Sequence, residues 1–133
     1  MGRYLDDAKT LYNEALHELE RWQQTQNPAI LRDAAEKAWG AVTQAANELL
    51  ETYGRRVPSG TGGRKSELHA LERHDRQLRT LRLEDRFNSA ENILHKECFY
   101  DGICPLPLVT EKVTEDVKEY LDDVEQVTQN HRR

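Results

Sequence analysis

The sequence predicts an all-α fold, an up-and-down bundle of four to five helices in one domain over residues 1–133. At 133 residues, the chain is long enough for one compact domain and too short for two ordinary ones. Its hydrophobic fraction of 37% is low and its charged fraction of 32% is high, which is typical of amphipathic helices with charged outer faces. Apolar residues recur at intervals of three and four, which is the period of a helix.

Two long helices are predicted first, over residues 4–24 and 28–53. Asn27 is a favoured N-cap, and Pro28 at the first helical position costs no hydrogen bond. Gly54 ends the second helix. The short connection between the two helices predicts an antiparallel hairpin. The stripe of the first helix consists of Tyr4, Leu5, Ala8, Leu11, Tyr12, Ala15, Leu19 and Trp22.

Residues 54–63 are predicted to form a mobile loop, because this stretch has four glycines and one proline. A phosphate-binding loop is the alternative interpretation of the glycines. However, the Walker pattern is absent and no strand precedes the loop.

The second half of the chain predicts a helix that opens at Ser66, another that begins near residue 83, and a last helix over 108–129. The spacing leaves open whether the first two of these are separate or form one bent helix. Residues 102–107 are predicted to form a turn, because two prolines cannot continue a helix.

The location of the protein is predicted to be cytoplasmic. No apolar run approaches the ~18–20 residues of a membrane span, and no signal peptide opens the chain. We therefore expect no membrane partner and expect Cys98 and Cys104 to be reduced thiols. Their spacing is not a metal-binding pattern, and we expect neither a metal nor a cofactor.

Charge is distributed unevenly along the chain, whose formal net charge is −5. Residues 55–86 hold nine basic and five acidic side chains, a net +4, and the remaining residues hold ten and nineteen, a net −9. Five arginines of this segment are candidate binding residues for the phosphates of RNA, for a nucleotide or for an acidic partner. The alternative is a solvated face with glutamate and aspartate partners. These candidates are Arg73, Arg76, Arg79, Arg82 and Arg86.

Arg64 and His69 form a sharper pattern, with four residues between them. Metal-independent ribonucleases can use such a pair, in which the histidine moves protons and the arginine stabilises charge on the phosphate. The two residues are therefore candidate catalytic residues, and the sequence leaves open whether the protein is an enzyme.

Two stretches of the chain, residues 33–42 (DAAEKAWGAV) and 90–102 (AENILHKECFYDG), resemble the HEPN superfamily, the higher eukaryotes and prokaryotes nucleotide-binding domain. The likeness is to archaeal repeat-family members and spans most of the chain. It implies an up-and-down helical bundle that forms homodimers. Some members are ribonuclease toxins with an Arg-x(4–6)-His motif, often paired with a minimal nucleotidyltransferase.

The chain departs from the motif of the active members. That motif usually lies at the start of the penultimate helix, where Arg86 and His95 are eight intervening residues apart. We therefore expect a non-catalytic binding or partner module of a toxin–antitoxin or nucleotidyltransferase-associated type. The alternative is a metal-independent ribonuclease that uses Arg64 and His69.

Overall fold

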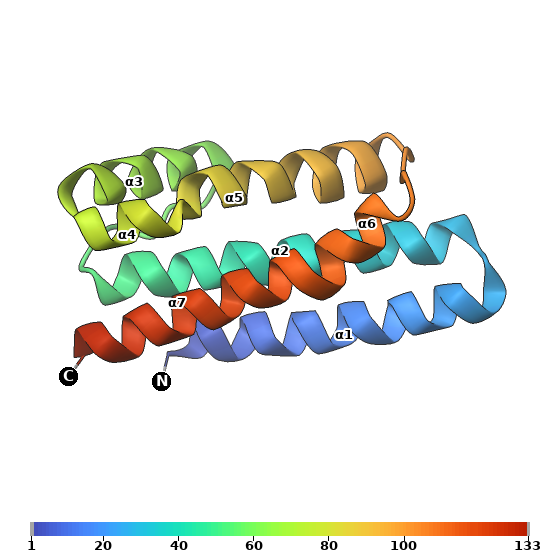
Figure 1. Ribbon diagram of the computed structural model, residues 1–133, viewed down its shortest axis with the longest axis horizontal. Helices are drawn as coiled ribbons and strands as arrows, with labels where there is room; N and C mark the ends of the chain where they lie inside the picture. The colour runs from blue at the N-terminus through green and yellow to red at the C-terminus, as the bar shows by residue number, and fades with distance from the viewer. Residues whose placement is uncertain (1, 133) are drawn as a thin grey trace.

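The computed structural model describes residues 2–132, and its helices form an up-and-down bundle (Figure 1). No strand occurs among the described residues, so the all-α prediction is confirmed. The two ends of the chain lie at the same end of the bundle. In chain order the elements are α1 (Arg3–Thr25), α2 (Pro28–Thr52), α3 (Thr61–His74), α4 (Arg76–Leu81), α5 (Leu83–Ala90), the π-helical segment η1 (Glu91–Tyr100), α6 (Leu108–Glu111), the π-helical segment η2 (Lys112–Asp116) and α7 (Val117–Arg132).

Helix α2 is the centre of the bundle, because it packs against α1, α3, α5, η1 and α7. Small side chains let its neighbours approach: Ala34, Ala38 and Ala45 are fully buried. A Cβ atom on Gly40 would lie 3.2 Å from Leu11 Cδ1, so α1 and α2 are close at that point. Close approach without voids is what a dense helical core requires.

The predicted hairpin of α1 and α2 is confirmed, and so are its caps. Asn27 Oδ1 accepts a hydrogen bond of 3.0 Å from the Ala29 amide, and Pro28 occupies the first position of α2. After α2, Gly54 has a φ of 73°, a left-handed conformation that glycine adopts without strain.

The third helix begins earlier than the sequence predicts. Helix α3 starts at Thr61, not at Ser66, so part of the predicted mobile loop is helical. The glycines lower the local propensity, but tertiary contacts outweigh propensity in short helices. One such contact is the hydrogen bond of 2.8 Å that Arg64 Nε donates to Asn47 Oδ1 on α2.

Two breaks settle the question of whether the next helices are separate. Asp75 is extended and its Oδ1 accepts the Leu78 amide at 3.0 Å, which caps α4. Arg82 has a φ of 55° and ends α4 before α5 begins. The chain therefore folds back on itself, and α5 packs against α3.

The prediction of reduced thiols is wrong, because Cys98 and Cys104 form a disulfide. Gly102, with a φ of 73°, turns the chain between them and brings their Cα atoms to 4.4 Å. The prediction did not take account of this turn, which depends on the loop geometry. Within residues 2–132, no helix has both the length and the apolar character that a bilayer crossing requires.

A buried carboxylate ties three helix ends together. Glu48 on α2 is fully buried, accepts the Leu5 amide at 3.1 Å near the start of α1, and pairs with Arg132 Nη2 at 2.7 Å near the end of α7. A Cβ on Gly2 would overlap this carboxylate, which would then have to shift from its partners. Buried charges are tolerated when they are paired and hydrogen-bonded in this way.

Candidate functional site

A hollow of about 400 Å³ lies where α3, α4 and α5 meet, and we call it the α3–α5 groove. It exists because the breaks at Asp75 and Arg82 fold α5 back along α3. Five side chains line it, and all of them are polar or charged: His69, Glu72, Arg73, Arg79 and Glu84.

His69 and Glu84 form a pair at the groove. The Nδ1 atom of His69 lies 2.9 Å from Glu84 Oε1, so the carboxylate fixes the orientation of the imidazole. The side chain of His69 is 58% exposed, and its Nε2 is the nitrogen left for a ligand. Glu84 also lies in the first turn of α5, where the helix dipole favours a negative charge.

Glu72 is a buried carboxylate with a capping role. Its Oε2 accepts the Glu84 amide at 2.6 Å, which satisfies one of the free N–H groups at the start of α5. Burial raises the pKa of Glu72, although the Glu84 amide opposes this shift. The carboxylate is therefore occupied by the backbone.

Arg79 and Arg73 differ in how they are held. Arg79 caps the end of α3, since its Nε donates to the Glu72 carbonyl at 3.1 Å and its Nη2 to the Arg73 carbonyl at 2.9 Å. Among residues 2–132, the guanidinium of Arg73 makes neither a hydrogen bond nor an ion pair. Arg73 is exposed, so it is the cation of this groove that is available to a ligand.

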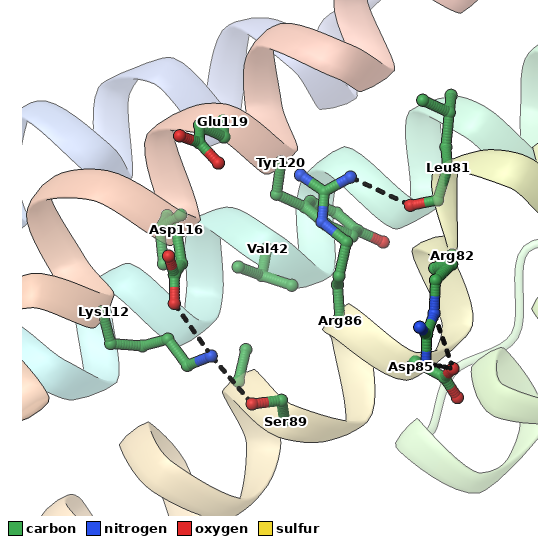
Figure 2. Close-up of a pocket in the computed structure, with 12 residues that line it drawn as sticks. Val42, Leu81, Arg82, Asp85, Arg86, Ser89, Lys112, Asp116, Glu119 and Tyr120 are labelled. Atoms are coloured by element: carbon green, nitrogen blue, oxygen red, sulfur yellow. Dashed lines mark hydrogen bonds and ion pairs between the residues drawn. The ribbon is translucent and has the colours of Figure 1, made fainter.

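The five arginines predicted to bind do not share one surface. Arg73 and Arg79 line the α3–α5 groove, whereas Arg76 is exposed on α4 outside it. Arg82 and Arg86 line a second cavity on the other side of α5 (Figure 2). Arg82 pairs with Asp85 at 2.8 Å, and Arg86 pairs with Asp123 at 2.9 Å. The five arginines therefore divide between the groove and the second cavity, with Arg76 outside both.

Arg64 and His69 have separate surroundings. Arg64 Nε donates to Asn47 Oδ1 at 2.8 Å, and burial lowers the pKa of its guanidinium. It does not line the groove. Five residues along an α-helix correspond to a rotation of about 140°, so the two side chains leave α3 in different directions.

Sequence reasoning missed Glu72 and Glu84. Glu72 follows His69 by three residues, a spacing that places the two on one face of a helix and could have indicated it. For Glu84 there is no such signal, because only the fold brings α5 to α3.

The chain matches no family model, no curated protein and no solved structure. Over residues 2–132, no three His, Cys, Asp or Glu side chains are placed to hold a metal ion together.

Proposed function

We propose that this protein is a non-catalytic helical binding module whose α3–α5 groove takes a phosphate group of RNA or of a nucleotide. The observation that carries the proposal is how the charged side chains of the groove are paired. Glu84 pairs with His69 and Glu72 accepts a backbone amide, and among residues 2–132 neither carboxylate forms an ion pair with Arg73. An exposed guanidinium beside an oriented imidazole suits a phosphate, which accepts charge-assisted hydrogen bonds.

Binding of a fluorescently labelled single-stranded RNA, followed by anisotropy over a salt series, tests this proposal. Removing one phosphate contact lowers the slope of log K against log salt by about 1, and we expect this from Arg73→Gln. Arg56→Gln is the matched control, because Arg56 is an exposed arginine of the same basic segment that does not line the groove. Equal loss in both variants, or no binding by the unaltered protein, would contradict the proposal.

A metal-independent ribonuclease is the second candidate, and the Glu84–His69 hydrogen bond favours it. A carboxylate on Nδ1 holds an imidazole so that Nε2 can move protons. This ribonuclease hypothesis differs from the one based on Arg64 and His69. Arg73 and Arg79 line the groove with His69, and Arg64 takes no part in the chemistry.

Incubation with total RNA beside a His69→Ala control separates the two candidates. The ribonuclease reading requires cleavage that His69→Ala abolishes and that Arg64→Gln keeps. Equal cleavage by the unaltered protein and His69→Ala would remove His69 as the catalytic residue. Binding without cleavage favours the non-catalytic module.

The proposal of a partner module includes a homodimer. Support comes from an apolar end patch, which we define as Tyr100, Ile103, Leu106 and Leu108, with exposed fractions of 76%, 60%, 53% and 44%. The disulfide between Cys98 and Cys104 closes the loop that carries Tyr100 and Ile103. A second copy could cover this patch about a twofold axis, since the same surface then meets itself.

Sedimentation of the purified chain tests the dimer. We expect a dimer mass for the unaltered protein and a single-chain mass for Ile103→Glu, with Asn13→Glu, an exposed site on α1, as control. A single-chain mass for the unaltered protein would contradict the proposal. From the resemblance to the HEPN superfamily we also propose a nucleotidyltransferase as partner. A nucleotidyltransferase gene beside the gene of this chain would support this partner.

A further inference from the structure

A second cavity, which we call the α5–α7 pocket, lies on the opposite side of α5 from the groove and has a volume of about 390 Å³ (Figure 2). Its floor is apolar and belongs to the core. The floor residues are Val42, Ala90, Val117 and the ring of Tyr120, and each is at most 4% exposed. A cavity of this size with an apolar lining and a few polar groups is typical of small-molecule sites.

The rim of the pocket carries charge on two facing walls. Asp116 and Glu119 lie on the wall formed by η2 and α7, and Arg86 reaches across from α5 (Figure 2). The residues that line the rim are three cations, Arg82, Arg86 and Lys112, and three carboxylates, Asp85, Asp116 and Glu119. Asp123, outside the lining, also pairs with Arg86. A ligand that carries only negative charge would therefore meet at least as much repulsion as attraction.

Two basic side chains, Lys112 and Arg86, face the floor. Each is held in place by partners and still has N–H groups that could bind a ligand. Lys112 Nζ donates to Ser89 Oγ at 2.7 Å and pairs with Asp116 Oδ2 at 3.1 Å, which leaves one of its three protons. Arg86 Nη1 donates to the Leu81 carbonyl at 3.1 Å and to Asp123 Oδ2 at 2.9 Å. Its Nε and Nη2 make no hydrogen bond within residues 2–132. The guanidinium lies 5.4 Å from the centre of the Tyr120 ring.

The wall formed by η2 and α7, which we call the acidic wall for its Asp116 and Glu119, has carboxylate oxygens that could still accept hydrogen bonds. Within the described chain, Glu119 forms neither an ion pair nor a hydrogen bond, and Asp116 bonds through one oxygen only. Lys112 and Asp116 are four residues apart in η2, a spacing that places both on one face of the helix. Short π-helical segments such as η2 are frequent at functional sites.

We propose that the α5–α7 pocket binds a small zwitterion with an apolar body, namely a free amino acid with an aliphatic side chain. Its carboxylate is held by Arg86, its ammonium by Glu119 and Asp116, and its side chain covers Val42 and Ala90. Opposite charges on facing walls select a ligand that carries both, and the apolar floor selects its hydrocarbon part. This site is independent of the proposed function of the α3–α5 groove.

Titration of the isotope-labelled protein, followed by NMR shifts of the Val42 and Ala90 methyl groups, tests the proposal. The ligands are leucine, isoleucine and methionine, with isopentylamine and 4-methylpentanoate as the two halves of leucine and inorganic phosphate as an anion. We expect at least one amino acid to bind saturably and each half to bind about tenfold more weakly or worse, because each half loses one charge-assisted contact. No saturable shift with any of the three amino acids, or equal binding of a half or of phosphate, would overturn the proposal.

A variant of the acidic wall and a control variant outside the pocket complete the test. Glu119→Gln should weaken amino-acid binding about tenfold. Glu115→Gln, an exposed residue of η2 outside the pocket, should leave it unchanged. Both sites are exposed, so neither change removes core packing. An equal effect of the two substitutions, or no effect of Glu119→Gln, would overturn the role of Glu119. It would also overturn the proposal of a zwitterionic ligand.

Discussion

The two sides of α5 differ in what they offer to a ligand. On the α3 side, the groove is lined entirely by polar side chains, and the guanidinium of Arg73 has no partner among residues 2–132. On the α7 side, the pocket has a floor of core residues, and its basic side chains are held by partners. The first site suits a charged group at a surface, and the second suits a small molecule with an apolar part.

This difference has a physical origin in how each side is built. The groove follows from two chain breaks, at Asp75 and Arg82, and Glu72 and Arg79 cap the helix ends that these breaks expose. By contrast, the pocket follows from the packing of α5 against α7, which are distant in sequence. Loss of the Arg73 guanidinium, which caps no helix end, should therefore affect binding alone, whereas loss of a core residue beneath α5 should affect stability.

The largest expected effect is that of Phe87→Ala, which removes the core anchor of α5. Phe87 is fully buried and its ring centre lies 4.9 Å from that of Trp39. Truncation of a buried aromatic costs about 3–5 kcal/mol, which urea unfolding would measure. Phe87→Leu, which keeps most of the volume, should cost less. Similar losses for the two variants would show that the contact with Trp39, and not the volume, holds α5.

A smaller loss of stability is expected from Arg64→Ala. Asn47 is 3% exposed, and the substitution removes the donor to its Oδ1. An unsatisfied buried acceptor costs about 1–3 kcal/mol. RNA affinity, measured on the folded variant, should not change, because Arg64 does not line the groove. Weakened RNA binding at unchanged stability would return Arg64 to the candidate site.

Glu72→Gln should change how stability depends on pH. The folded-state pKa of Glu72 is raised, by burial first and also by the charges of Glu84 and Asp85, whereas the Glu84 amide and His69 lower it. In the window between the unfolded and the folded pKa the native state binds more protons, so this group contributes stability below the window and loses it as the pH rises.

Urea unfolding at about pH 4 and about pH 7 tests this sign, because an ordinary glutamate titrates near the lower value. Relative to the unaltered protein, Glu72→Gln should be more stable at the higher pH than at the lower one. Its amide oxygen can still accept the Glu84 amide. Glu115→Gln, an exposed site, should show no such trend. A trend of opposite sign would mean that hydrogen bonding outweighs burial at Glu72.

The smallest change in stability is expected from His69→Ala. The side chain is 58% exposed and its partner Glu84 keeps a place in the first turn of α5. Exposed pairs contribute about 0.2–1 kcal/mol, so thermal unfolding should shift little. A loss well above this range would mean that the Glu84–His69 pair joins α3 to α5, and the groove would then be structural.

The sequence by itself determined the helical bundle and the first hairpin. Apolar spacing is a local property, so it revealed the helices, and Asn27 with Pro28 marked the start of α2 because caps act within one turn. Local propensity failed at Thr61, where the contact of Arg64 with Asn47 on α2 supports a helix that glycines disfavour.

Only the tertiary structure decided which charged residues meet. Arg64 and His69 are near in sequence, but packing directs one to Asn47 and the other to Glu84. Lys112 and Ser89 come together across the α5–α7 pocket, although they are 23 positions apart in the sequence. A side chain's partner depends on how each helix is rotated against its neighbours, and that rotation is set by burial of the whole core and not by any local pattern.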